Sequence, residues 1–194
     1  ERAEALLREA YALDTRGALN GYYAAPLLEL LLREGRLTEA LDAARRVAAR
    51  SSAMAQAVGA AFEGEALLRL GKRDEALAAR ERAGQALPGL DTAMKLPGAY
   101  NPRWRVQPYL DSLDGMLDLA GRDVAAGEKA LTGIADHIAA SPHLDAWAEG
   151  LIWLERAVAL ARQLNRPALA ETLLARIARI DPTYKPPVSS GAQP

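Results

Sequence analysis

A short motif recurs four times along this chain and constrains the fold more than any other feature. Its clearest copy is the segment 64–88, in which Gly71 separates two helix-forming runs and Pro88 closes the second. Because glycine readily adopts the left-handed conformation that ends many helices, Gly71 predicts a turn between two short helices. Ala76 follows this turn by five residues, where a small side chain lets the second helix pack closely on the first. The segment therefore predicts a helical hairpin.

The same spacing occurs at three other predicted turns, Gly35, Gly121 and Asn165. An alanine stands five residues after every turn, and the four alanines are Ala40, Ala76, Ala126 and Ala170. The turns lie further apart after Gly71, so the later hairpins are enlarged. One such hairpin cannot bury its apolar side alone, and stacking on its neighbours supplies the core.

Apolar residues recur at helical spacing in the segments that flank these turns. We expect helices over 1–14, 22–34, 38–50, 53–70, 74–87, 109–120, 123–140, 141–164 and 167–180. Thr38 is expected to cap the third helix and Pro88 to end the fifth. A break is expected over 15–21.

Residues 89–108 differ in composition from the predicted helices, because prolines and aromatic residues replace the apolar periodicity. We expect an irregular, proline-rich insert there, since non-periodic stretches of this length are uncommon inside compact domains. The tail, 184–194, is expected to be disordered. The helical repeat domain is therefore expected to span 1–183.

The composition excludes several classes of partner and chemistry. Half of the 194 residues are hydrophobic but only 5% are aromatic, which predicts a core of Ala and Leu. A net charge of −1 offers no global field for nucleic acid or an anionic membrane. No apolar run is long enough to cross a bilayer. The absence of cysteine excludes disulfides, thiolate nucleophiles and Cys-based metal sites.

The chain begins at Glu1, already in helical pattern, so we expect either a signal peptide or a preceding domain upstream. The cations are 20 Arg and 4 Lys, a ratio more typical of a GC-rich genome than of a guanidinium-specific task. We expect a bacterial protein, of either the cytoplasm or the periplasm.

The spacing around Gly71 resembles the tetratricopeptide repeat, a helix-turn-helix unit of about 34 residues. The matching residues are Gly64, Gly71, Ala76, Ala83 and Pro88, together with the ending Ile180–Asp181–Pro182. Two positions depart from the family pattern: Ala60 replaces the usual Trp, and Arg80 replaces the usual aromatic of the second helix. The resemblance implies an all-α, right-handed superhelical solenoid of about four units plus one leading helix. A generic helical bundle is the alternative.

The resemblance also implies a concave groove, lined by the first helix of each unit, that binds a peptide or partner protein. Carried over by position, the groove candidates are Tyr22, Glu29, Arg33, Glu65, Arg69, Glu155 and Arg162. Glu29/Arg33 and Glu65/Arg69 are i, i+4 pairs that either hold a partner or only stabilise their own helices. The positions that bind acidic C-terminal tails in chaperone-binding relatives hold Glu, Ala and Asp here, which disfavours that ligand.

A second candidate surface is the trio Arg103, Trp104 and Arg105 in the insert. Tryptophan and arginine are enriched at binding hot spots, so Trp104 is a candidate partner anchor. Alternatively, the insert folds back and Trp104 fills a gap between units.

We find no nucleophile–base arrangement and no phosphate-binding glycine loop. His137 and His143 lack a third ligand at a matching spacing. The sequence therefore predicts no catalytic residue, no metal and no cofactor. It favours a non-catalytic interaction scaffold. The alternative is a C-terminal regulatory or self-assembly domain of a larger signalling protein or enzyme, including a homo-oligomer.

Overall fold

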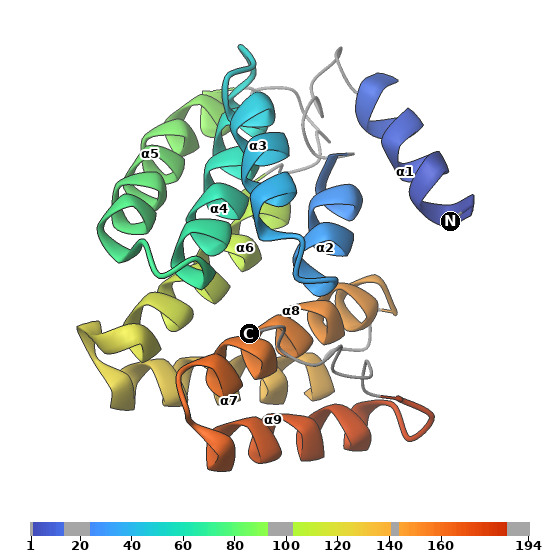
Figure 1. Ribbon diagram of the computed structural model, residues 1–194, viewed down its shortest axis with the longest axis vertical. Helices are drawn as coiled ribbons and strands as arrows, with labels where there is room; N and C mark the ends of the chain where they lie inside the picture. Colours follow the sequence, from blue (N-terminus) through green and yellow to red (C-terminus); the bar gives the residue numbers. More distant parts are fainter. Residues whose placement is uncertain (1, 14–23, 93–102, 141–143, 186–194) are drawn as a thin grey trace. The chain divides into compact units, whose positions relative to one another are not determined.

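The computed structural model describes residues 2–13, 24–92, 103–140 and 144–185, and over these residues the chain is all-α, as predicted (Figure 1). The helices are α1 (Arg2–Leu13), α2 (Ala25–Arg33), α3 (Leu37–Ala48), α4 (Ala53–Arg69), α5 (Arg73–Thr92), α6 (Arg103–Leu117), α7 (Val124–Ala140), α8 (Leu144–Gln163) and α9 (Pro167–Ile180). A π-helical turn, η2 (Asp118–Arg122), joins α6 to α7. The predicted break at 15–21 and the end of the predicted tail, 186–194, lie outside the described residues.

The chain divides into two compact units, Glu1–Ala130 and Leu131–Pro194, with the boundary inside α7. In the first unit, each helix from α2 to α6 contacts the next one along the chain. The first helices of successive hairpins are also in contact, α2 with α4 and α4 with α6. In the second unit, α8 packs on α9.

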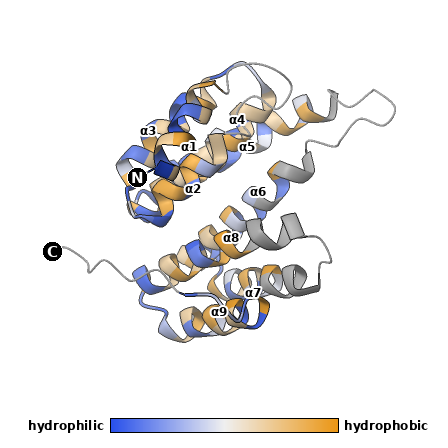
Figure 2. Ribbon diagram, turned by 90° about the vertical axis from the view of Figure 1, so that its right-hand side faces the viewer, coloured by the Kyte–Doolittle hydropathy of each residue, from blue (hydrophilic) through white to orange (hydrophobic). Residues whose placement is uncertain are grey.

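Helix α4 is the most deeply buried element of the first unit, because small residues let its neighbours approach. Almost every side chain from Met54 to Leu68 is buried, and many of them are alanine. A Cβ added at Gly59 would lie 2.3 Å from the Ala48 nitrogen, so α3 and α4 are in backbone contact there. Helix α2, mainly orange in Figure 2, adds buried leucines to this core. The predicted Ala and Leu core is present in the described part of this unit.

All four predicted turns have the left-handed conformation. The φ angles are 73° at Gly35, 77° at Gly71, 121° at Gly121 and 55° at Asn165. Three of these turns share one hydrogen-bond pattern. The N–H of the turn residue donates to the carbonyl three residues earlier, and the N–H of the next residue donates to the carbonyl five residues before itself. At Gly71 the two bonds are Gly71 N–H to Leu68 O, 3.0 Å, and Lys72 N–H to Leu67 O, 2.9 Å. Gly35 and Asn165 repeat both bonds. This pattern is the Schellman motif.

The turn at Gly121 is one residue longer, and this corrects the predicted role of Ala126. In the other three hairpins, the alanine N–H bonds the carbonyl of the residue after the turn, for example Ala76 N–H to Lys72 O. After Gly121 the equivalent bond runs from Gly127 N–H to Asp123 O, 2.9 Å. A Cβ at Gly127 would lie 2.4 Å from the Leu119 nitrogen. Gly127, rather than Ala126, is therefore the small contact residue of this hairpin.

Two predicted helix ends were wrong. Thr38 lies inside α3, whose N-cap residue is Arg36, because the helix begins two residues after the turn glycine. Helix α5 continues through Pro88 to Thr92. Its buried stripe runs on past the proline to Leu90, which is 3% exposed. Tertiary packing therefore maintains the helix although Pro88 donates no backbone hydrogen bond.

The predicted irregular insert, 89–108, is also shorter than expected. Helix α5 occupies its first residues and α6 begins at Arg103, so both of its ends are helical. Residues 93–102 lie outside the described part of the chain.

Candidate partner-binding site

The predicted groove residues of α2 and α4 are not ordinary exposed ion pairs, because both carboxylates are in the interior. Glu29 on α2 is 8% exposed and Glu65 on α4 is 3% exposed. Arg33 is exposed at the end of α2, whereas Arg69 is half-buried at the end of α4. In each pair, therefore, the arginine is more exposed to solvent than the glutamate.

Arg69 joins two neighbouring first helices. Its Nη1 donates to the Leu32 carbonyl oxygen at 2.6 Å, and Leu32 lies in the last turn of α2. This oxygen also accepts from the Gly35 N–H in the turn, and the partial negative charge of a helix C-terminus favours a guanidinium there. Arg69 thus fixes the end of α2 against the end of α4, at the position predicted for partner binding.

The remaining predicted residues belong to other parts of the chain. Tyr22 lies outside the described residues. Glu155, half-buried, and Arg162, exposed, belong to α8 in the second unit. The backbone of 103–105 forms the first turn of α6, so Trp104 stands at a helix start and not in a loop.

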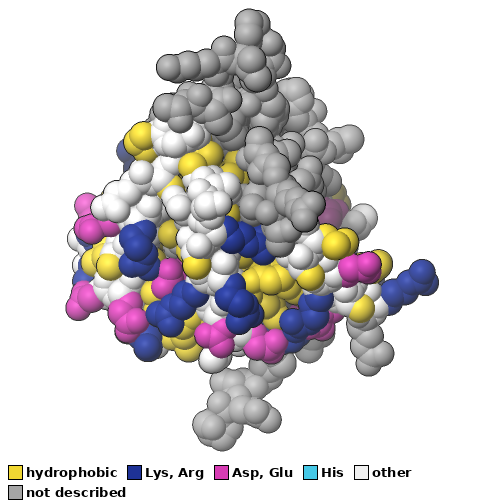
Figure 3. Space-filling view, turned by 90° about the horizontal axis from the view of Figure 1, so that it is seen from above, with side chains coloured by type: hydrophobic (Ala, Val, Ile, Leu, Met, Phe, Trp, Pro, Cys, Tyr) yellow, Lys and Arg dark blue, Asp and Glu magenta, His cyan; other side chains and the backbone are white. Residues whose placement is uncertain are grey.

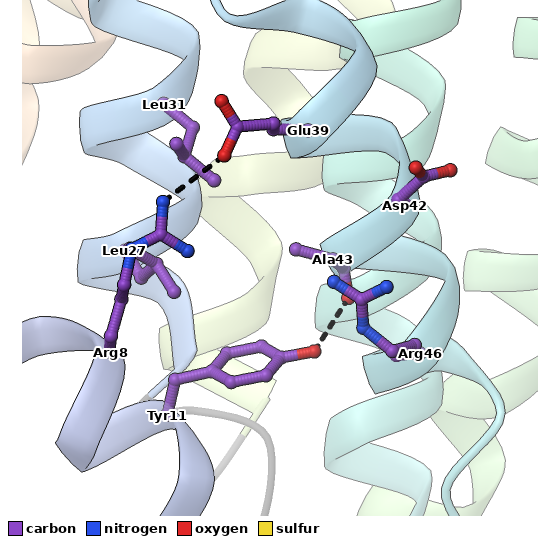
Figure 4. A pocket seen from close by; sticks show the side chains of 8 residues that line it. All are labelled: Arg8, Tyr11, Leu27, Leu31, Glu39, Asp42, Ala43 and Arg46. Atoms are coloured by element: carbon purple, nitrogen blue, oxygen red, sulfur yellow. Dashed lines mark hydrogen bonds and ion pairs between the residues drawn. The ribbon is translucent and has the colours of Figure 1, made fainter.

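A cavity of about 260 Å³ lies between α1, α2 and α3 in the first unit (Figure 4). Its lining residues are Arg8 and Tyr11 from α1, Leu27 and Leu31 from α2, and Glu39, Asp42, Ala43 and Arg46 from α3. The two leucines form an apolar floor, and charged side chains surround it. Sequence reasoning missed this cavity because three separate segments must come together to form it.

An ion-pair network runs along one side of the cavity. Arg36 at the start of α3 contacts Glu4 of α1 at 2.8 Å and Glu39 of α3 at 2.8 Å. Arg8 contacts the same two carboxylates, Glu4 at 2.7 Å and Glu39 at 3.1 Å. Hydrogen bonds from Arg36 and then Arg8 lower the pKa of Glu39 to about 2 and also lower the pKa of Glu4. Both carboxylates therefore stay ionised well into the acid range.

Two further ion clusters join successive helices, and no pattern in the sequence predicted either of them. The buried carboxylate of Glu63 on α4 accepts from Arg45 Nε of α3 at 2.9 Å and from Arg82 Nη2 of α5 at 2.8 Å. Arg80 of α5 donates twice to Asp114 of α6, at 3.0 and 2.6 Å. An ion pair thus joins α5 to α6.

The charges of the visible surface are mixed. Figure 3 shows arginine and lysine side chains beside aspartate and glutamate over one face. Among the described residues, no group of three His, Asp or Glu side chains is arranged to hold a metal ion. Within the same part of the chain, no helix combines the length and the apolar composition that crossing a bilayer requires.

No protein-family model, curated protein or solved structure matches this chain.

Proposed function

We propose that this chain is a non-catalytic scaffold, a stacked array of tetratricopeptide-like hairpins that binds a peptide or partner protein. The observation that carries the proposal is the turn geometry. Three hairpins share a left-handed turn residue (Gly35, Gly71 or Asn165), the same two Schellman bonds and the same alanine bond. Similar hairpins that stack on their neighbours form continuous arrays, and such arrays present extended binding surfaces.

The proposed binding surface follows the first helices α2 and α4. These helices contact each other and carry Arg33 and Arg69 at equivalent positions, two residues before their turn glycines. Arg33 is the better probe of binding, because it is exposed and its replacement leaves the core intact. Replacing Glu65 would instead disturb a buried side chain, which would confuse lost binding with lost folding.

The test is partner capture from a native lysate on immobilised protein, with two matched charge reversals. Arg33→Glu alters the proposed surface in the last turn of α2, and Arg179→Glu makes the same change in the last turn of α9. We expect Arg33→Glu to lose the captured partner while Arg179→Glu retains it, with both helical spectra unchanged. Equal capture by both variants would place binding elsewhere on the chain.

A second candidate function, self-assembly, is favoured by the outer face of α1. Ala3, Leu6, Ala10 and Leu13 alternate at three- and four-residue spacing, as in the seam of a coiled coil, and all four are exposed. Leu6 is 58% and Leu13 is 73% exposed. We expect light scattering to show a mass that rises with concentration, and Leu6→Glu to abolish the rise while Ala5→Glu does not. A strict monomer at every concentration would exclude this function.

A further inference from the structure

Helix α1 is attached to the first unit through polar contacts. Glu4 and Arg8 reach Arg36 and Glu39 across the gap to α3, at 2.8 and 3.1 Å. The Tyr11 hydroxyl donates to the Ala43 carbonyl oxygen at 3.1 Å. None of the twelve residues of α1 is buried. The helix also lies against α2, but charge and hydrogen bonds, and not a shared apolar core, join it to α3.

The end of α1 is secured in the same manner. The Arg50 guanidinium lies 5.2 Å from the centre of the Tyr11 ring, and its Nη2 donates to the Tyr11 carbonyl oxygen at 3.3 Å. Each of these contacts involves a side chain that is exposed or half-buried. Exposed ion pairs of this kind contribute little individually and weaken as salt increases.

Beneath α1 lies the cavity floored by Leu27 and Leu31 (Figure 4). Side chains of α1 bridge this space to α3 and leave it unfilled. A helix of twelve residues is marginal on its own in water, so α1 depends on these bridges for its structure. Elements with few buried apolar contacts open locally at a lower free energy than the core.

We propose that α1 is a charge-held strap, which detaches while the rest of the first unit stays folded and thereby uncovers Leu27 and Leu31 of α2. The detached state presents an apolar surface that the attached state covers. Because the attachment is ionic, ionic strength controls how often this surface is open.

Backbone hydrogen exchange of the full chain tests the proposal. In wild type we expect amides of α1 to exchange faster than those of α4, and to accelerate further between 0.05 and 1 M NaCl. Screening explains the direction, since the Debye length falls to about 3 Å at 1 M salt. Exchange of α4 is expected to respond much less to the salt. If α1 were as protected as α4 at both salt concentrations, the strap would be disproved.

Two matched variants isolate the ion pairs. Glu39→Gln removes the α3 carboxylate that holds Arg8, without changing the sequence of α1. Glu75→Gln makes the same change at the equivalent first-turn position of α5, where Glu75 contacts Lys72 and Arg45. We expect Glu39→Gln to accelerate α1 exchange about two- to five-fold, and Glu75→Gln to leave it unchanged. Equal effects of the two variants on α1 would overturn the proposal.

Discussion

At the scale of single residues, glycines set how closely the helices of the first unit approach. Gly59 faces the backbone of α3, and a Cβ there would lie 2.7 Å from the Ala48 Cα and 2.8 Å from the Ala44 carbonyl oxygen. These neighbours are backbone atoms, so they yield only if a whole helix moves. Gly133 on α7 has open space around the same position.

One substitution should therefore have opposite effects at these two sites. Gly133→Ala is expected to stabilise by about 0.4–1 kcal/mol, because alanine loses less conformational entropy on folding. At Gly59 the steric cost of about 1–3 kcal/mol outweighs that gain, so Gly59→Ala is expected to destabilise. Urea unfolding followed by circular dichroism measures both. A stabilising Gly59→Ala would show that α3 and α4 are not in close contact.

The buried carboxylate of Glu63 is the second residue with a predictable effect. Glu63→Gln keeps the shape of the side chain but removes the charge from two hydrogen bonds, to Arg45 and Arg82. Hydrogen bonds to charged groups contribute about 1.5–3 kcal/mol. Both arginines are half-exposed and recover hydration, so we expect a loss of about 1–2 kcal/mol in urea unfolding.

Glu81→Gln is the matched control for this prediction. Glu81 is exposed on α5, next in sequence to Arg82, and its change should stay within about 0.5 kcal/mol. If both variants lost the same stability, the Glu63 cluster would not contribute to the fold.

At the scale of elements, the attachment of α1 should depend on pH. The pKa of Glu4 on α1 is lowered, first by Arg36 across the gap to α3. The pKa of Glu39 is about 2, against an ordinary value of 4.5, first because of Arg36 on its own helix and then because of Arg8 of α1, and only the part due to Arg8 depends on the attachment. A lowered pKa in the attached state means that the attachment is at full strength above about pH 4.5. It is lost as the pH falls toward 2. The charged groups that face these carboxylates are Arg8 from α1, Glu34 from the end of α2, and Arg36, Asp42 and Arg46 from α3.

Backbone amide NMR during an acid titration checks this expectation. Amide signals of α1 should move toward random-coil positions between about pH 4.5 and 2, ahead of those of α4. In Glu39→Gln the change should be smaller, because the carboxyl with the lowest pKa is gone. Simultaneous movement of α1 and α4 signals at every pH would contradict independent release of the helix.

The sequence predicted local features of the elements well, because neighbouring residues determine them. Gly35, Gly71, Gly121 and Asn165 all have left-handed backbone at the predicted positions. Features that need tertiary contacts were missed. Helix α5 passes through Pro88 because Leu90 packs in the core beyond it. The Glu63 cluster joins residues 18 and 19 positions apart, and no sequence period indicates such a pairing.

The candidate site was less predictable than the fold for the same reason. The family resemblance selected Glu29 and Glu65 by position, but burial depends on what packs over them. The cavity under α1 needs three helices to meet. The contact residue of the third hairpin was also predicted one position too early, at Ala126 instead of Gly127, since the turn at Gly121 has one residue more.

At the scale of the whole molecule, contacts in the first unit join neighbouring helices, from α2 with α3 to α5 with α6. In the stacked array proposed above, stability is close to a sum of unit and nearest-neighbour contributions. A substitution at one helix–helix contact should therefore destabilise that contact most and the contacts between distant helices least.

Gly59→Ala supplies such a perturbation, since it acts at the contact of α3 with α4. We expect the variant to increase hydrogen exchange most in α3 and α4, less in α5, and least in α6, which contacts α4 less extensively than α5 does. Mass spectrometry of peptic fragments resolves these segments. Wild type under urea concentrations that match the lost stability is the control, because it separates graded opening from uniform destabilisation. An equal increase from α3 to α6 would show that the first unit opens as one cooperative body and not as an array.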